Sequence, residues 1–124
     1  MSDPAIRVLL VDDDQPFCKA MAKALRRRGF DVDWANDGPA AVNAFKQPGK
    51  QDVAVLDLRM PSMDGLSVLR ATPGREVPVI VLTGHGTVPD AVEAMRLGAY
   101  TFLTKPVDAA DLAPVLTQAA RPQR

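Results

Sequence analysis

Apolar and polar residues follow two alternating patterns along this chain. Near-continuous apolar runs of strand length alternate with segments whose apolar residues recur at helical spacing. The runs predict strands at 6–11, 31–35, 53–58, 77–83 and 100–104. A helix is predicted after each strand, beginning after Asp14, covering 40–45 and 66–71, and beginning after Thr87 and after Asp108. The pattern therefore predicts five strand–helix units in succession.

This alternation indicates a parallel sheet with helices on both faces, because right-handed crossovers return each helix to the side of the sheet. For five strands the common order is 2-1-3-4-5, the flavodoxin-like doubly wound α/β fold. The segment 31–35 alternates polar and apolar residues, as expected of an edge strand. In this fold a ligand binds where the strand order reverses, at the carboxyl ends of strands 1 and 3.

Several residues are expected to mark where helices begin and end. Asp14 and Asp108 are predicted N-caps, and Thr87 and Asp90 have the spacing of a capping box. Gly29 follows the last apolar residues of the first helix and is expected to end it.

Three of the helices carry features that affect their length or orientation. The Thr-Pro-Gly sequence at 72–74 is expected to end the third helix early. Val92, Met95 and Ala99 are predicted to lie on the inner side of the fourth helix. Pro114 lies inside the last helix and is expected to kink or shorten it.

Length and charge narrow the class of protein. A chain of 124 residues is expected to form a single domain over 1–124, with a core at 6–118. Residues 119–124 would be a frayed tail or the start of a linker to an output domain. The 15 Lys and Arg balance 15 Asp and Glu, so nothing supports nucleic-acid or membrane-surface binding by this domain. No apolar run reaches membrane-spanning length.

Cysteine usage points to a compartment. Cys18 is the only cysteine, so an intrachain disulfide is impossible, and no signal-peptide pattern begins the chain. Both observations favour a cytoplasmic location. Cys18 itself is expected to be a core residue of the first helix. The basic run 26–28 is interpreted either as a binding patch or as solvated residues that complement the helix dipole.

Polar residues follow the buried strands where those strands end. Asp12 and Asp13 follow the first strand, Asp57 the third, Thr83 the fourth and Lys105 the fifth. Because the carboxyl ends of parallel strands share one edge, we expect these side chains to converge. Two carboxylates about 4 Å apart repel each other by roughly 4 kcal/mol at an effective dielectric near 20. Mg²⁺, which prefers oxygen ligands and often shares them with a phosphate, would relieve that repulsion.

The same cluster is suited to phosphoryl transfer. A carboxylate such as Asp57 can attack phosphorus and form an aspartyl phosphate. Lys105 supplies a positive charge for a phosphoryl oxygen, and Thr83 supplies a hydroxyl donor. Catalysis would then consist of positioning and charge neutralisation.

Four sequence motifs carry a family resemblance. LLVDDD, LDLRMPSMDG, VIVLTGHG and FLTKP, each at the end of a predicted strand, resemble the receiver domains of two-component response regulators over about 6–118. The resemblance implies that Asp57 accepts a phosphoryl group from the phosphohistidine of a sensor histidine kinase. It implies Mg²⁺ ligation by Asp13 and Asp57, with Asp12 acting mostly through water and the Arg59 carbonyl as a further ligand.

The resemblance also implies further roles. Thr83 and Lys105 would contact the phosphoryl group, and the Lys105–Pro106 bond is expected to be cis. Phe102, where a tyrosine is commoner in the family, would turn inward after phosphorylation. The protein would be no enzyme beyond catalysing its own phosphorylation and dephosphorylation.

Partners and kinetics are likewise implied only by the resemblance. The fourth helix, last strand and last helix would form a signalling face and a possible homodimer interface. The side chains of Arg59 and His85 would tune hydrolysis of the aspartyl phosphate. The output would be regulation of transcription, and the chain would be either a stand-alone regulator or one domain of a longer protein.

Three other interpretations remain open from the residues. The acids after the first strand also resemble the nucleophile loop of haloacid-dehalogenase-type phosphatases, in which Asp12 would be phosphorylated. That interpretation leaves Asp57 unexplained. The fold would also suit an interaction module that is never phosphorylated. It would suit a flavin carrier as well, although an acidic first loop repels a flavin phosphate.

Overall fold

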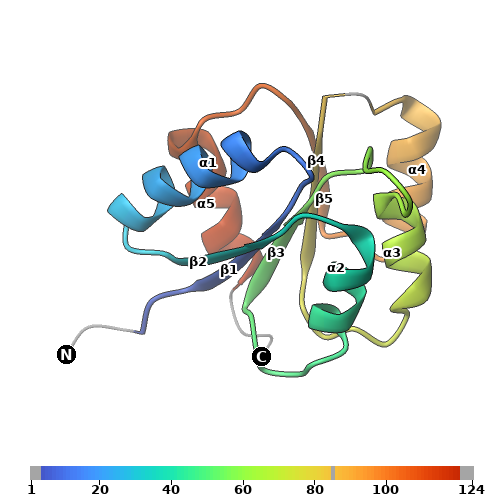
Figure 1. Cartoon of the computed structure of the whole chain (residues 1–124), viewed down its shortest axis with the longest axis horizontal. Coiled ribbons are helices and arrows are strands. Elements are labelled where there is room, and N and C mark those ends of the chain that lie inside the picture. The colour runs from blue at the N-terminus through green and yellow to red at the C-terminus, as the bar shows by residue number, and fades with distance from the viewer. Residues whose placement is uncertain (1–3, 85, 121–124) are drawn as a thin grey trace.

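A five-stranded parallel sheet forms the centre of the molecule (Figure 1). The computed structural model describes residues 4–84 and 86–120. The strands are β1 (Arg7–Val11), β2 (Asp31–Ala35), β3 (Val53–Leu56), β4 (Val79–Thr83) and β5 (Thr101–Thr104). The helices are α1 (Gln15–Arg27), α2 (Gly38–Phe45), α3 (Gly65–Ala71), α4 (Val88–Arg96) and α5 (Ala109–Ala119). The strand order is β2-β1-β3-β4-β5, so the predicted doubly wound fold is confirmed.

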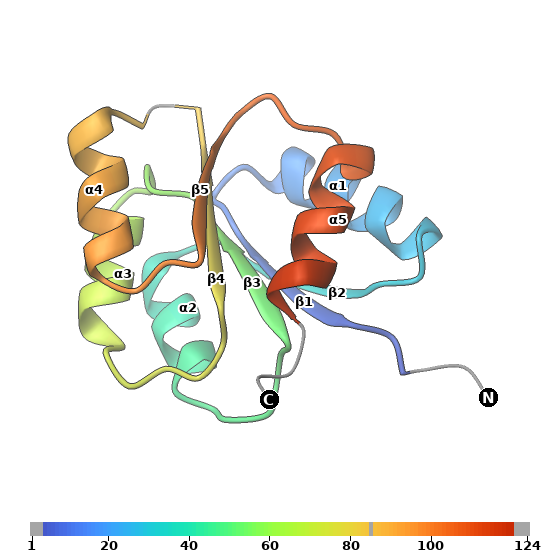
Figure 2. The ribbon, with the colours of Figure 1, turned by 180° about the vertical axis from the view of Figure 1, so that it is seen from behind.

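Helices cover both faces of the sheet and bury two separate apolar clusters. In Figures 1 and 2, α1 and α5 lie on one face, while α2, α3 and α4 lie on the other. Within β1, Val8 and Leu10 join the α1–α5 cluster, whereas Leu9 and Val11 join the opposite one. Because both faces are covered, the central strands are apolar at almost every position, which explains their continuous apolar runs.

Side chains at the helix ends satisfy backbone groups as expected. The carboxylates of Asp14 and Asp108 accept from the backbone N–H groups of Phe17 and Asp111. Thr87 and Asp90 form the predicted capping box at the start of α4. Gly29 has a φ of +95°, the left-handed conformation with which glycine ends α1.

The predicted effects of the helix breakers are confirmed for α3 only. That helix ends at Ala71, directly before the Thr-Pro-Gly sequence. Helix α5 instead continues through Pro114 to Ala119, so the expected shortening does not occur. Leu112, Leu116 and Ala119 are buried, and their packing outweighs the hydrogen bond that proline cannot donate.

The predicted inner side of α4 is wrong. Val92 and Met95 are 55% and 47% exposed, and the buried residue of the helix is Ala94. Ala99 is buried but lies beyond the end of α4. Helix α4 contacts α3 and the edge strand β5, so a narrow face with a small residue suffices to dock it. Larger apolar side chains therefore remain in solvent.

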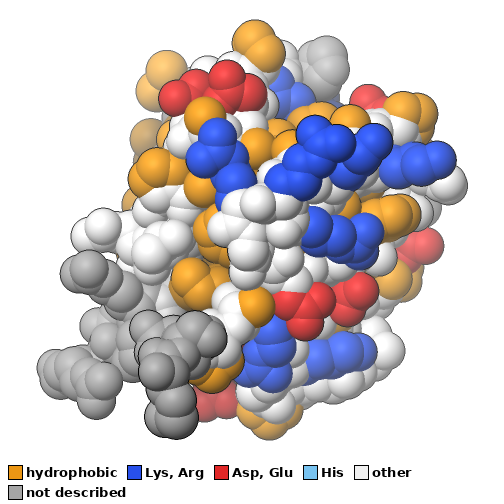
Figure 3. All heavy atoms as spheres, turned by 90° about the vertical axis from the view of Figure 1, so that its left-hand side faces the viewer, with side chains coloured by type: hydrophobic (Ala, Val, Ile, Leu, Met, Phe, Trp, Pro, Cys, Tyr) orange, Lys and Arg blue, Asp and Glu red, His pale blue; other side chains and the backbone are white. Residues whose placement is uncertain are grey.

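Lys and Arg side chains gather on the side of the molecule formed by α1 and β2 (Figure 3). A shallow groove there is lined by Lys19, Lys23, Arg26, Arg27 and Trp34. The Arg26 guanidinium lies 5.8 Å from the centre of the Trp34 ring and donates to the Val32 carbonyl at 2.6 Å. Arg26 therefore covers a carbonyl on the outer edge of β2, which hinders pairing with another strand.

Candidate functional site

Backbone hydrogen bonds hold the two acidic loops at one edge of the sheet. The Asp12 N–H donates to the Ala35 carbonyl at 3.1 Å, and the Asp57 N–H donates to the Val11 carbonyl at 2.9 Å. Both bonds extend the parallel ladders by one residue beyond the strands. The carboxyl ends of β1 and β3, the predicted switch point, therefore carry these acids side by side.

Three carboxylates meet at this edge. Asp12, Asp13 and Asp57 can each offer one oxygen such that all three oxygens lie within 4.8 Å of one another. Asp12 and Asp57 are only 3% and 6% exposed, whereas Asp13 faces solvent. The predicted convergence is confirmed, and this oxygen-rich group could hold a metal ion.

Lys105 brings the positive charge that the sequence predicts. Its ammonium nitrogen lies 2.6 Å from Asp12 Oδ2 and 4.0 Å from Asp57 Oδ2. The same nitrogen lies 4.2 Å from the centre of the Phe17 ring, a cation–π contact. The Lys105–Pro106 bond is cis, as expected.

Thr83 connects the end of β4 to the acid at the end of β3. Its side chain is fully buried, and its hydroxyl donates a hydrogen bond to the Asp57 carboxylate. Burial nevertheless raises the pKa of Asp57 above its ordinary value of 3.8, and the charge of Asp12 adds to the rise. The bonds from Thr83 and the Arg59 N–H and the charge of Lys105 oppose that rise in pKa.

Phe102 lies next to this threonine. A methyl group built on Gly86 would collide with the Phe102 ring and would come within 2.8 Å of Thr83 Cγ2. The ring is half-buried and packs against the apolar cluster beneath α2, α3 and α4. Phe102 and Thr83 therefore both border Gly86, and the predicted switch role of these two side chains stays a prediction.

Arg59 and His85 are the two remaining predicted site residues, and the structure describes less of their surroundings. The backbone N–H of Arg59 lies 3.4 Å from Asp57 Oδ1, and its side chain is exposed. His85 lies outside the described residues, so its predicted role stays a prediction.

Gly65 allows the loop after β3 to close over the site. A Cβ at this position would lie 2.5 Å from the Asp57 carbonyl oxygen and 2.9 Å from Leu58 Cα. Asp64, directly before it, caps α3 by accepting from the Ser67 N–H. Only glycine therefore permits the first turn of α3 to approach the loop that carries Asp57 so closely.

The sequence interpretation missed Asn36, which lies beside the cluster. Asn36 donates to the Asp12 carbonyl at 2.8 Å, and the Asp14 N–H donates to Asp12 Oδ1 at 3.0 Å. Asn36 follows an edge strand that neighbours β1, and the predicted strand order was enough to place it near Asp12. Cys18 is buried as expected, and burial raises the pKa of its thiol to about 12, so it is no nucleophile.

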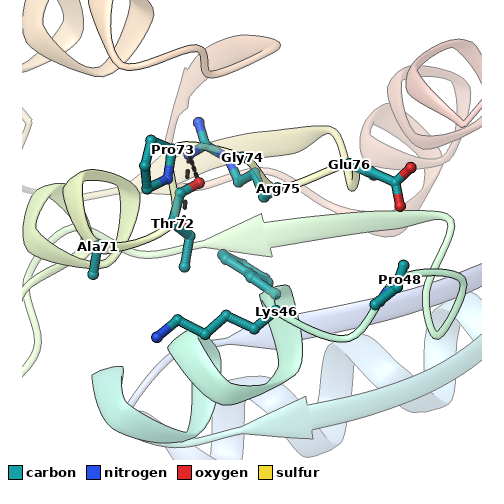
Figure 4. Close-up of a pocket in the computed structure, with 9 residues that line it drawn as sticks. Lys46, Pro48, Ala71, Thr72, Pro73, Gly74, Arg75 and Glu76 are labelled. Carbon is teal, nitrogen blue, oxygen red and sulfur yellow. Dashed lines mark hydrogen bonds between the residues drawn. The ribbon is translucent and has the colours of Figure 1, made fainter.

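A hollow lies toward the opposite, amino-terminal edge of the sheet. It has a volume of about 310 Å³ and is lined by residues that include Lys46, Thr72, Arg75 and Glu76 (Figure 4). None of the acids, the threonine or the lysine described above lines it. The converging polar groups therefore mark the carboxyl edge as the candidate site.

Fold and site together define a class of doubly wound α/β domains with an acidic cluster and a lysine at the switch point. Residues 8–117 match the family described as response regulator receiver domain, and the chain belongs to that family. It is 41% identical over 118 residues to the acid tolerance regulatory protein ActR of Rhizobium meliloti (strain 1021). It is 40% identical over 112 residues to the transcriptional regulatory protein GlrR of Escherichia coli (strain K12).

Solved structures agree with this assignment. The fold is similar to that of FixJ-N, with a TM-score of 0.82 and 37% identity, covering 97% of this chain and 95% of the other. It is also similar to a response regulator receiver protein from Pseudomonas putida, with a TM-score of 0.84 and 30% identity, covering 94% and 99% of the two chains.

The curated relatives are longer proteins. The matched region covers 93% of this chain and 60% of ActR, and 87% of this chain and 24% of GlrR. Within residues 4–84 and 86–120, none of the helices is long and apolar enough to cross a membrane.

Proposed function

We propose that Asp57 accepts a phosphoryl group from the phosphohistidine of a sensor histidine kinase, and that the domain then changes conformation to regulate an output. The observation that carries this proposal is the close approach of the Asp12, Asp13 and Asp57 carboxylates beside Lys105. Membership of the receiver family supports it. The proposed activity is limited to the domain's own phosphorylation and dephosphorylation.

In the proposed reaction, a carboxylate oxygen of Asp57 bonds to phosphorus as the N–P bond of phosphohistidine breaks. The leaving imidazole nitrogen keeps the electron pair of that bond and takes a proton from water. Lys105 then contacts one phosphoryl oxygen. The Thr83 hydroxyl turns away from the carboxylate and donates to a second phosphoryl oxygen. These new contacts exist only in the phosphorylated state, so they can shift a two-state equilibrium.

The donor set suits magnesium. Asp13 and Asp57 would hold the ion directly, Asp12 mostly through water, and the Arg59 carbonyl would be a further ligand. A bound Mg²⁺ would neutralise the acids and the phosphoryl oxygens. The three carboxylates offer only oxygen atoms, which is the ligand type that this ion prefers.

A phosphatase that uses Asp12 as its nucleophile is not favoured. Asp12 Oδ2 accepts from Lys105 at 2.6 Å and Oδ1 accepts from the Asp14 N–H at 3.0 Å. Asp12 is therefore held in a short ion pair with the lysine, whereas Asp57 accepts from Thr83 and the Arg59 N–H and lies 4.0 Å from Lys105.

We further propose that α4, β5 and α5 form the signalling face and a homodimer interface. Val88, Val92, Met95 and Tyr100 are 78%, 55%, 47% and 42% exposed on α4 and just before β5. An apolar groove between β5 and α5 continues this surface past Pro114 and Val115. An output in transcription is proposed by analogy with GlrR, whose name describes a transcriptional regulatory protein.

The decisive experiment is intact mass spectrometry after incubation with acetyl phosphate and Mg²⁺. One added phosphoryl group is expected in the unaltered chain and in Asp64→Asn, a matched change at an exposed helix cap. None is expected in Asp57→Asn. Phosphorylation that persists in Asp57→Asn would point to another acceptor, such as Asp12, and would overturn the proposal.

Two finer roles need separate measurements. Sedimentation with and without the phosphodonor tests the homodimer, and Met95→Glu should prevent any phosphorylation-dependent association. The decay of the phosphorylated protein in Arg59→Ala and His85→Ala tests whether these side chains tune hydrolysis. Unchanged decay in both variants would remove that role.

A further inference from the structure

We propose that Asn36 is a positioning residue for the metal site, holding the loop that presents Asp12 and Asp13. The inference rests on the proposed metal-dependent function and extends it to a residue on an edge strand. Asn36 follows β2 and lies outside the five polar residues of the cluster.

Two side chains converge on one backbone oxygen. Asn36 Nδ2 lies 2.8 Å from the Asp12 carbonyl oxygen, and the Cys18 thiol lies 3.5 Å from the same oxygen. Asn36 Nδ2 also lies 3.8 Å from Cys18 Sγ. The amide thus joins the end of β2 to the acidic loop between β1 and α1 and to the first turn of α1.

Hydrogen bonds hold both the backbone carbonyl and the carboxylate of Asp12. Its carbonyl is held by Asn36, and its carboxylate is held by Lys105 at 2.6 Å and by the Asp14 N–H at 3.0 Å. Asp13 lies between two residues that are tied in place, although its own side chain is exposed. The peptide plane between Asp12 and Asp13, and hence the direction of the Asp13 carboxylate, depends on the Asn36 bond.

Electrostatic repulsion explains why the hydrogen bond from Asn36 is needed. Before a cation binds, the three carboxylates repel one another, and the exposed Asp13 can relieve that repulsion by moving outward. The hydrogen bond from Asn36 to the carbonyl of the preceding residue, Asp12, opposes this movement. Loss of a group that orients a metal ligand typically weakens metal affinity by about 10- to 100-fold.

A purely structural role for Asn36 makes a different prediction. A bond that only satisfies a buried carbonyl would stabilise the fold and leave the Mg²⁺ affinity of the folded protein unchanged. A positioning role lowers the affinity of protein that is still fully folded. Stability and metal affinity must therefore be measured separately.

The experiment measures the Mg²⁺ dissociation constant of Asn36→Ala and Asn36→Leu by calorimetry, together with thermal unfolding in EDTA. Leucine keeps the branched shape and the number of heavy atoms of the side chain if alanine fails to fold. Asn43→Ala is the matched control, because Asn43 is the other asparagine of the chain and is exposed on α2. We expect a dissociation constant about tenfold higher for both Asn36 variants and unchanged for Asn43→Ala.

The outcomes separate this inference from the proposed function. An affinity within twofold of the unaltered chain in both folded Asn36 variants would overturn the positioning role and leave the phosphorylation site intact. An unaltered chain that binds no Mg²⁺ would overturn both. In NMR spectra of the folded Asn36 variants, Mg²⁺-induced shifts of the Asp13 amide signal should appear only at higher concentration, as a second readout.

Discussion

Lys105 Nζ lies 2.6 Å from Asp12 but 4.0 Å from Asp57. The lysine is therefore paired with Asp12 rather than with Asp57, the proposed phosphoryl acceptor. Its ammonium group thereby offsets part of the charge that a cation would neutralise. Asp57 remains bonded to the Thr83 hydroxyl and is only 6% exposed. A phosphoryl group on Asp57 would compete for Lys105, and Mg²⁺ would replace its charge near Asp12.

Lys105→Met is therefore expected to destabilise the protein more in EDTA than in Mg²⁺. Without the ion, Asp12 loses a charge-assisted hydrogen bond and stays buried, at a cost of about 2 kcal/mol. With the ion, the carboxylates keep a positive partner and the loss is smaller. Urea unfolding in the two buffers measures the difference, with Lys19→Met at an exposed position of α1 as the control. An equal loss in both buffers would contradict the assigned role.

Asp57 should make the metal-free protein less stable as pH rises. Burial raises its pKa in the folded state, so the folded protein binds this proton more tightly than the unfolded chain does. The free energy of unfolding then falls as pH rises from about 3.8, the pKa in the unfolded chain, to the raised pKa of the folded state. At higher pH it stays at the lower value. Asp57→Asn removes this loss and should stabilise the protein at neutral pH, with the gain disappearing below about pH 4.

Asp52 provides a control of opposite sign. Its hydrogen bond with Arg7 lowers its pKa, so it contributes stability above its unfolded pKa and loses it as pH falls. Asp52→Asn should therefore destabilise the protein at neutral pH. Thermal unfolding of both variants in EDTA between pH 3 and 8 compares them directly. Parallel pH profiles for the two variants would refute the sign predicted for Asp57.

The sheet and the acidic cluster were predictable because each depends on a short-range pattern. Buried parallel strands are apolar on both faces, and Asp12, Asp57 and Thr83 directly follow or end them. Once the strand order is inferred, residues far apart in sequence fall at one edge. The bond from Asn36 to Asp12 depends instead on side-chain geometry between two loops, which no local pattern encodes.

The inner face of α4 shows where periodicity alone fails. Apolar residues occur around much of this helix, so spacing does not single out Ala94 over Val92 or Met95. Pro114 fails as a helix breaker for a related reason. Its exposed ring faces away from Leu112 and Leu116, and tertiary packing keeps α5 intact around it.

Gly86→Ala should displace the Phe102 ring. The added methyl group would occupy space held by the ring and by Thr83 Cγ2, and such overpacking costs about 1–3 kcal/mol. The loss should be smaller when Phe102→Leu is present as well, because the smaller side chain makes room. A double-mutant cycle by urea unfolding measures this coupling. Strictly additive losses would show that the ring and Gly86 do not compete for space.

Arg75 ties α3 to the far end of α4. Its guanidinium donates to the carbonyls of Leu69 and Thr72 at 3.1 and 2.9 Å and to Leu97 at 2.5 Å. The dashed lines in Figure 4 mark its bonds to Thr72. These carbonyls lie at the C-terminal ends of the two helices, where a cation is favoured. A second arginine, Arg70, also joins the helices, through an exposed ion pair with Glu93 at 3.5 Å.

The two arginines should differ sharply in their contribution to stability. Arg75→Ala removes the charge-assisted bonds to the Leu69, Thr72 and Leu97 carbonyls and should lower the free energy of unfolding by about 2–3 kcal/mol. The Leu69 and Thr72 carbonyls still accept from backbone N–H groups, so the loss falls chiefly on the bond to Leu97. Arg70→Ala removes only an exposed ion pair, expected to contribute about 0.2–1 kcal/mol. Hydrogen exchange of the amides at the end of α4 should quicken in Arg75→Ala alone, because only Arg75 binds the backbone there. Equal effects of the two substitutions would mean that Arg75, although partly buried, contributes no more to holding α4 than the surface ion pair of Arg70 does.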